Sequence, residues 1–151
     1  METKHNYQVN VTWLAERKGI LESLVLDSNI EVATPPEFPK GMVGIWSPEH
    51  LFVAAVNSCF MTTFLSVAEN SKLEFTQFEC DAVGTLEKID GKYMISEITL
   101  SPVLTLAGEN DKGLRVLEMS EKACLIANSV KTKVTLRPQI RIELPQEITA
   151  T

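Results

Sequence analysis

Histidine and cysteine are scarce in this sequence: His5 and His50 are the only histidines, and three cysteines occur among 151 residues. Neither residue type has the spacing of zinc ligands, and no C-x-x-C pair is present. The sequence also lacks a Gly-rich phosphate loop and a G-x-S-x-G elbow. These absences argue against a specific metal site, a nucleotide site and a serine hydrolase.

Positive charge is also in short supply, since 14 Lys and Arg stand against 20 Asp and Glu and the net charge is −6. Nucleic acids and anionic membrane surfaces both bind basic faces, so neither is an expected partner. The N-terminal segment METKHNYQVN lacks the apolar stretch of a signal peptide. We therefore expect a cytoplasmic protein, in which a cysteine that matters is more often catalytic, redox-active or metal-binding than structural.

The most informative stretch is SPEHLFVAAVNSCFMTTFLSVAEN, residues 47–70. Ser47 can cap a helix, Pro48 suits the first helical position, and Glu49 favours the positive end of the dipole. The apolar side chains that follow point in nearly every direction around the axis, which predicts a buried helix. Small polar residues interrupt the run, so we expect a core helix covered by a sheet or a second subunit, and not a membrane span.

Strand patterns flank this helix on both sides. Asp90-Gly91 predicts a tight hairpin, and Pro102 predicts a bulge or an edge. The expected order is strands at 7–13 (half-buried), 20–26 and 30–33, a loop at 34–44, the helix, strands at 73–86 and 92–106, a second helix at 112–127, a final strand at 130–144 broken by Pro138, and a frayed tail from Pro145. This irregular alternation predicts an α+β fold with a mostly antiparallel sheet, in one domain over residues 1–151.

The thiols are the remaining source of chemistry. Cys59 lies in the middle of the long helix and Cys124 on the second helix, and both helices must pack against the same sheet. The two thiols could therefore face each other, although a free cysteine is most often a small buried hydrophobe. Small polar residues surround Cys59 where a core position would more often have aliphatic ones: Asn57, Ser58, Thr62 and Thr63. Cys80 alternates with the apolar side of a strand and is interpreted as a core residue.

A reactive cysteine must ionise, which requires a nearby positive charge or a helix N-terminus. Cys59 lies too far along its helix to benefit from the dipole. Arg17, in the first hairpin turn, is the first candidate for the cation, and Lys18 and Lys40 are alternatives. From composition alone, a solvated surface charge is the more ordinary role for Arg17.

Two segments resemble motifs of a known family. Residues 47–52, followed by Ala54-Ala55 and Cys59, resemble the central-helix signature of the OsmC/Ohr family. This family comprises the osmotically inducible protein C and the organic hydroperoxide resistance proteins. The segment 121–124 (Glu-Lys-Ala-Cys) resembles the second cysteine motif of the family.

The resemblance covers roughly residues 9–142. Arg17 with Gly19 resembles the arginine turn of the Ohr branch. The clearest departure follows the second cysteine, where the family usually has proline and this chain has Leu125. The loop at 34–44 also differs from Ohr sequences and contains no arginine. The branch is therefore left open.

The resemblance implies a thiol-dependent peroxidase that reduces organic hydroperoxides. Cys59 would become a sulfenic acid, Cys124 would resolve it as a disulfide, and a dithiol such as dihydrolipoamide would reduce that disulfide. Arg17 would hold the thiolate and polarise the peroxide, and Glu49 would position Arg17. No metal or other cofactor is implied.

Three phenylalanines of the long helix, Phe52, Phe60 and Phe64, are the expected substrate-binding residues. They also carry the alternative function, in which an OsmC-like stress protein without enzymatic activity binds a small apolar ligand. Another thiol chemistry, such as disulfide reduction, is a third reading.

The helix geometry predicts a homodimer. Glu49 and Cys59 are ~15 Å apart along one helix. If both belong to one site, a partner subunit must supply Glu49 or Arg17 must bridge the two. The all-round apolarity of the helix likewise requires more cover than one sheet provides, so we expect an intertwined two-fold dimer.

Overall fold

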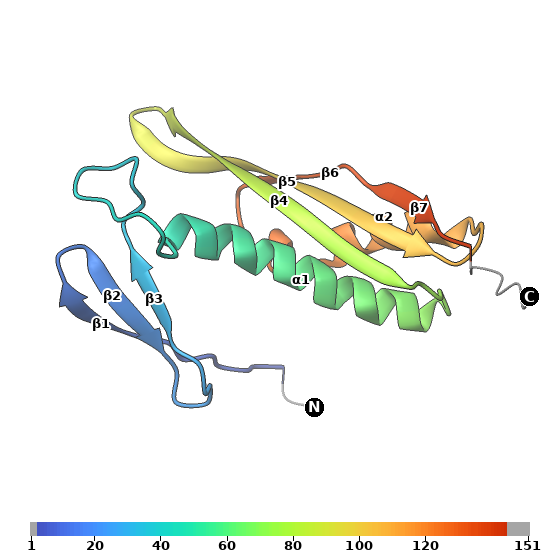
Figure 1. Cartoon of the computed structure of the whole chain (residues 1–151), viewed down its shortest axis with the longest axis horizontal. Helices are drawn as coiled ribbons and strands as arrows, with labels where there is room; N and C mark the ends of the chain where they lie inside the picture. Colours follow the sequence, from blue (N-terminus) through green and yellow to red (C-terminus); the bar gives the residue numbers. More distant parts are fainter. Residues whose placement is uncertain (1–2, 145–151) are drawn as a thin grey trace, which may run out of the picture. The chain divides into compact units, whose positions relative to one another are not determined.

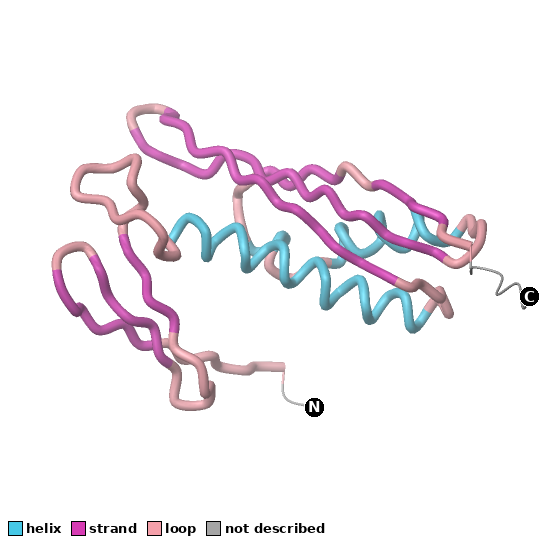
Figure 2. Tube along the Cα trace, in the orientation of Figure 1, coloured by secondary structure: helices cyan, strands magenta, loops and turns pink. Residues whose placement is uncertain are grey.

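The structure of the chain, a computed structural model, describes residues 3–144 and has an α+β fold (Figure 1). Strands and helices are coloured apart in Figure 2. The chain forms two compact units, one that runs through Phe52 and one that begins at Val53. The tail from Pro145, expected to be frayed, lies outside the described residues.

The first unit contains a three-stranded antiparallel sheet in the order β1-β2-β3, formed by β1 (Asn10–Ala15), β2 (Lys18–Glu22) and β3 (Ile30–Ala33). Glu16 and Arg17 form the β1–β2 turn, and Glu16 adopts a left-handed φ of 52° there. The second strand therefore begins earlier and ends earlier than the sequence predicts, because the tight turn draws Lys18 into the pairing with Ala15.

The first strand differs from the half-buried strand that its alternation predicts. Every residue of β1 is exposed, including Val11 at 62% and Trp13 at 74%. The alternation places these two large apolar side chains on one face of the strand, and no second layer within this unit covers that face. The pattern therefore indicates an apolar surface and not a core.

The long helix α1 (Pro48–Asn70) begins as the sequence predicts. The Ser47 hydroxyl is the N-cap, since it accepts a hydrogen bond of 3.1 Å from the backbone N–H of His50, and Ser47 is fully buried. Only one stripe of α1 is buried, formed by Val56, Phe60, Phe64 and Ala68. The opposite side of α1 exposes other apolar residues. The sequence predicts burial all round the helix, whereas the single chain buries one face of it.

By length and composition alone, α1 could also cross a membrane. Its most apolar window has a mean hydropathy of 1.8, and 22% of that window is buried. In the second unit one face of the helix packs on a sheet: a Cβ added at Gly84 would lie 2.6 Å from Val53 Cγ2.

That sheet is formed by β4 (Gln77–Ile89), β5 (Lys92–Leu106), β6 (Lys133–Leu136) and β7 (Gln139–Ile142). The hairpin expected at Asp90-Gly91 is confirmed, with φ of 50° and 79°. β4 and β5 pair antiparallel, whereas β6 and β7 each pair parallel with β5. The predicted final strand is thus two strands, divided at Arg137-Pro138.

Pro102 marks neither a bulge nor an edge, which corrects the prediction. It lies in unbroken register opposite Cys80, and the irregularity of this pair of strands falls at Thr85/Leu86. On its other side β6 ends opposite Leu100 and β7 begins opposite Val103. Pro102 therefore faces the break between these strands, where its missing N–H removes no ladder hydrogen bond.

The second helix, α2 (Lys112–Ala123), is shorter than predicted, because Cys124 leaves helical geometry with ψ of 113°. A short 3₁₀ turn, η1 (Ala127–Ser129), follows. A Cβ added at Gly113 of α2 would lie 3.3 Å from side chains of β5 and β7. The pairing of β4 with β5 puts these contacts on the sheet face that α1 also covers (Figure 1).

Candidate functional site

The two cysteines expected to act together do lie together in the second unit. Cys59 comes from the middle of α1, and Cys124 is the C-cap of α2. Both thiols are free, and they are close enough that each shifts the pKa of the other. The Cys124 thiol also approaches the Val56 carbonyl at 3.8 Å, which sets it against the turn of α1 that ends at Cys59. The packing of both helices on one sheet face produces this meeting.

Cys59 is the more acidic of the two thiols. Burial disfavours its ionisation, but hydrogen bonds to its sulfur outweigh this cost and hold its pKa below the ordinary value. The bonds come from the Ile126 N–H, the Cys124 thiol, the Thr63 hydroxyl and the Leu125 N–H, in that order of effect. The Thr63 oxygen lies 3.9 Å from the sulfur, one helical turn along α1.

Cys124 behaves in the opposite way. Burial raises its pKa, and the neighbouring Cys59 raises it further by hydrogen bonding and by charge, while the Ala127 and Ile126 N–H groups oppose the shift. The Cys124 side chain is fully buried, whereas Cys59 is partly exposed. Cys59 is therefore the thiol that ionises first and is accessible to solvent. Cys124 is the buried neighbour that retains its proton.

Cys80, the third cysteine, has an ordinary structural environment. Partial burial of this side chain on β4 raises the pKa of Cys80 to about 11, and the negative charge of Asp81 adds to the shift. Its backbone carbonyl accepts a hydrogen bond of 3.0 Å from Asn57 Nδ2 of α1. A thiol with this pKa is almost entirely protonated at neutral pH, so it has little nucleophilic character.

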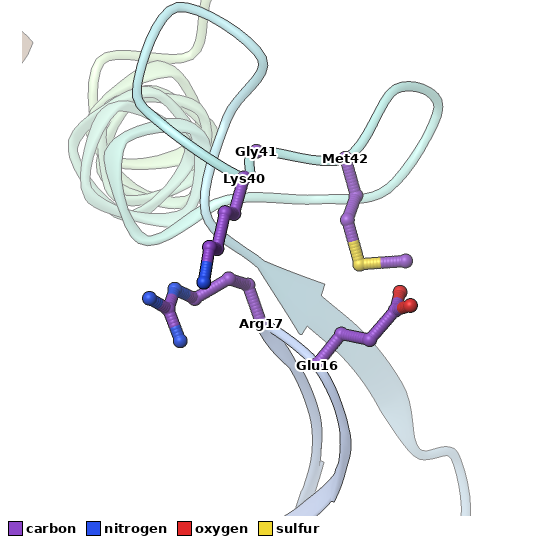
Figure 3. Close-up of a pocket in the computed structure, with 5 residues that line it drawn as sticks. All are labelled: Glu16, Arg17, Lys40, Gly41 and Met42. Carbon is purple, nitrogen blue, oxygen red and sulfur yellow. The ribbon is translucent and has the colours of Figure 1, made fainter.

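Arg17 and Glu49 belong to the first unit. Arg17 lines a pocket of about 430 Å³ with Glu16, Lys40, Gly41 and Met42. Figure 3 shows the Lys40 side chain directed toward Arg17 and the Glu16 carboxylate turned away from both. Within residues 3–144, neither cation forms an ion pair, and the salt bridge found there joins Lys18 to Glu31. Lys18 is thus engaged, whereas Arg17 and Lys40 form a positive pair open to an anion.

Glu49 lies in the first turn of α1, as predicted, and is half-buried. Its role in positioning Arg17, and the role of Arg17 at the thiols, stay predictions. Among the described residues, no three His, Cys, Asp or Glu side chains are grouped so that they could hold a metal ion.

The three phenylalanines expected to bind substrate differ in their surroundings. Phe60 and Phe64 are fully buried, and Phe64 stacks on Phe78 with ring centroids 4.6 Å apart and meets Phe75 edge-on at 5.1 Å. As placed, they form the core between α1 and β4 and line none of the described pockets. Phe52 is partly exposed. A substrate-binding role for the three stays a prediction.

Sequence reasoning missed the backbone donors at Cys59. The N–H groups of Leu125 and Ile126 carry no signature of residue type, since almost every residue has one. Two weaker signals existed: Thr63 lies four residues after Cys59, which is the spacing of neighbours on a helix face, and proline is replaced at position 125.

The α+β fold of this chain, with two helices packed on one sheet face, is shared with solved structures. Residues 40–139 match the family model of OsmC-like proteins. This match covers most of the chain and includes Cys59, Cys124 and the whole of α1. The chain belongs to the OsmC-like family.

Individual relatives agree with this assignment. An OsmC-like protein of unknown function from Vibrio cholerae has 26% identity and a TM-score of 0.81, with 89% of this chain and 99% of that one covered. An organic hydroperoxide resistance protein from Elizabethkingia anophelis has 19% identity and a TM-score of 0.73, with 93% and 100% covered, and shares the fold. The uncharacterised protein YmaD of Bacillus subtilis (strain 168) is 23% identical over 95% of this chain and 98% of its own length.

Proposed function

We propose that this protein is a thiol-dependent peroxidase that reduces organic hydroperoxides. The observation that carries the proposal is the pair formed by Cys59 and Cys124, in which a partly exposed thiol of lowered pKa lies beside a buried thiol of raised pKa. Peroxide reduction by sulfur needs a thiolate to attack and a second thiol to resolve the product. Solved proteins of the same fold are named organic hydroperoxide resistance proteins.

The reaction proceeds in three steps. The Cys59 thiolate attacks the O–O bond and takes one oxygen, and the leaving alkoxide takes a proton to become the alcohol. Cys124 then attacks the sulfenic acid sulfur, so that an S–S bond forms, the S–O bond breaks and water leaves. A dithiol of the dihydrolipoamide type reduces this disulfide by exchange and is itself oxidised to a disulfide.

Arg17 is proposed to hold the Cys59 thiolate and to polarise the peroxide, with Glu49 positioning its guanidinium. Two facts about the first unit support a role in binding an anion: Arg17 shares a pocket with Lys40, and neither cation has a carboxylate partner within residues 3–144 (Figure 3). Two positive charges held close together repel each other, and an anion bound between them offsets this repulsion.

We also propose that two copies of the chain form a homodimer. Apolar side chains remain exposed along α1 and, separately, along β1, among them Met61, Leu65, Val11 and Trp13. Water-exposed apolar surface of this extent marks an interaction site. A second copy of the chain would cover it.

The test is to react the fully reduced protein with one equivalent of cumene hydroperoxide, count the remaining thiols and map the peptides. The expected result is the loss of two thiols and a Cys59–Cys124 disulfide. Cys59→Ser should abolish peroxide consumption, whereas Cys124→Ser should still consume one equivalent and leave a sulfenic acid at Cys59 that dimedone traps.

Three thiols remaining in the wild-type protein, with the peroxide unconsumed, would refute the peroxidase function. In that case the alternative of a small apolar ligand, with Phe52, Phe60 and Phe64 around it, would be examined by ligand extraction from the purified protein. Cys80→Ser is the matched control, because this cysteine has a raised pKa and lies outside the pair.

A further inference from the structure

We propose that Asn57 is a positioning residue for the thiol pair: its side-chain amide fixes the rotation of α1 about its own axis and so keeps Cys59 turned toward Cys124. The inference rests on the proposed function only for what the pair does with a peroxide. The orientation of the two thiols is a property of the folded chain, and it can be measured without any peroxide.

Asn57 joins α1 to the sheet by a directional bond. Its Nδ2 donates to the Cys80 carbonyl of β4 at 3.0 Å, and both residues belong to the second unit. Along residues 53–70, no other side chain of α1 forms a hydrogen bond to the sheet within the described part of the chain. Ser58 and Thr62, for example, donate to carbonyls of α1 itself.

The Cys80 carbonyl is available for this bond because β4 is an edge strand, which pairs with β5 alone among the described strands. Backbone groups of successive residues on a strand point to alternate sides. The Leu100 carbonyl of β5 accepts from the Arg137 N–H next to β6, so Pro102, two residues further on, faces the same side. Cys80 lies opposite Pro102 and therefore directs its carbonyl away from β5, toward the free edge.

Apolar packing is a weak determinant of the rotation of this helix. Burial of apolar surface is non-directional, and α1 has apolar side chains outside its buried stripe, among them the exposed Met61 and Leu65. A helix turned so that these two faced the sheet would still bury apolar surface. The bond from Asn57 opposes such a turn, because the turn would carry Nδ2 away from the Cys80 carbonyl.

The other end of the amide indicates that Asn57 serves position more than stability. Its Oδ1 is buried and has no hydrogen-bond partner among the described residues. A buried acceptor without a partner destabilises the folded state. Buried polar groups that reduce stability are best known where they select one register of packed helices over another.

The rotation at Asn57 determines the direction of Cys59. Two positions along an α-helix differ by roughly 200°, so Cys59 lies on nearly the opposite side of the axis from Asn57. The end of α2 reaches this side of the helix at Val56, whose carbonyl lies 3.8 Å from the Cys124 thiol. Because so short a piece of helix is rigid, any change in angle at Asn57 is an equal change in angle at Cys59.

The experiment compares Asn57→Leu with Thr62→Val. Leucine keeps the branched shape of asparagine and removes the amide. Thr62→Val is the matched control, because it also replaces a polar side chain of α1 by an apolar one of similar shape. The bond lost in the control, from Thr62 Oγ1 to the Cys59 carbonyl at 3.1 Å, lies within the helix.

Each reduced protein is equilibrated with oxidised dithiothreitol. In this exchange the two thiols form a Cys59–Cys124 disulfide, and their two electrons and two protons pass to dithiothreitol, whose S–S bond opens to two thiols. Acid quenching and peptide mass spectrometry give the equilibrium constant. For Asn57→Leu, we expect this constant to fall by about tenfold, because a disulfide forms only within a narrow range of geometry. For Thr62→Val, we expect the wild-type constant.

Equal constants for Asn57→Leu and wild type, or an equal fall in Thr62→Val, would overturn the inference. A wild-type protein that forms no Cys59–Cys124 disulfide would also overturn it, because such thiols are not positioned for one. Urea unfolding shows whether Asn57→Leu is folded. If it is not, Asn57→Ala takes its place, since alanine has the highest helix propensity. Failure of both variants to fold would overturn the inference in favour of a purely structural role.

Failure of the proposed function is distinguishable, because the exchange uses no peroxide. A protein that consumes no hydroperoxide, but whose constant falls in Asn57→Leu and holds in Thr62→Val, would refute the peroxidase and support the positioning residue. A protein that consumes hydroperoxide and has one constant in all three forms would do the reverse.

Discussion

At the scale of the residue, the three thiols differ through their surroundings alone. Cys59 accepts hydrogen bonds that stabilise a negative sulfur, Cys124 is buried next to that sulfur, and Cys80 is partly buried near the Asp81 carboxylate. The same side chain is therefore most readily ionised at one position and retains its proton at the other two. In the proposed reaction, this difference would make Cys59 the attacking thiol and Cys124 the resolving thiol.

Cys80 gives a prediction about stability at alkaline pH. Its pKa in the folded chain is about 11, against an ordinary 9.0, because burial disfavours the thiolate. In the unfolded chain this thiol ionises near pH 9, whereas in the folded chain it stays neutral up to about pH 11. The stability of the folded state that depends on the neutral thiol is therefore fully present below pH 9 and is lost as the pH rises toward 11. We expect wild type to lose more stability between pH 8 and pH 10 (round values about the ordinary cysteine pKa) than Cys80→Ser does.

The expected difference is a fraction of the ~1.4 kcal/mol that one pKa unit represents, since the side chain is only partly buried. Urea unfolding at the two pH values measures it, and titrating groups common to both proteins cancel in the comparison. Peroxide consumption by Cys80→Ser should match that of wild type. An equal alkaline loss in both proteins would contradict the assigned cause.

At the scale of the element, α1 and β4 approach closely at one glycine. A Cβ at Gly84 would lie 2.6 Å from Val53 Cγ2, and the branched valine side chain has few other rotamers to adopt. Phe60 and Phe64 pack on Phe78 along the same interface. The absence of a side chain at position 84 therefore allows α1, which carries Cys59, to pack close to the sheet. A larger residue there would increase the distance between the helix and the sheet.

We predict that Gly84→Ala lowers the free energy of unfolding by about 1–3 kcal/mol, as overpacking of a filled interface does. Gly108→Ala is the matched control, because a Cβ there would meet nothing within 4 Å and this glycine has no left-handed φ. It should change stability by less than about 0.5 kcal/mol. Urea unfolding of both variants decides the matter, and equal effects at the two glycines would argue against close packing at Gly84.

At the scale of the whole molecule, the described part of the chain exposes apolar side chains on both α1 and β1. The most apolar window of α1 is only 22% buried, and β1 is exposed along its whole length. Removal of such surface from water is favourable, and this supports the proposed dimer. This argument concerns the area of apolar surface and does not depend on the chemistry of the thiols.

We predict a two-fold dimer by sedimentation velocity at micromolar concentration. Val11→Lys, on exposed β1, should shift the protein toward monomer, because it places a charge in an interface that excludes water. Thr3→Lys, outside the strands, is a control that adds the same charge and should leave the dimer intact. A wild-type monomer at this concentration would contradict the dimer.

Much of the fold follows from local sequence signals. Ser47, Pro48 and Glu49 determine where α1 begins, and Asp90-Gly91 determines the β4–β5 hairpin, because caps and tight turns depend on a few adjacent residues. The same locality explains the errors. No nearby residue signals that the second helix ends at Cys124 or that Pro102 faces a break between two strands, since those facts depend on where distant strands and helices pack.

For the site, the sequence by itself determined which residue types were present: three thiols, an arginine in the first turn and an unusual leucine after the second cysteine. Only the tertiary structure decided how they are used. It brought Cys59 and Cys124 together by seating α1 and α2 on one sheet face. The physical reason is that a pKa is set by burial and by hydrogen-bond donors in space, and residues separated by most of a domain supply both.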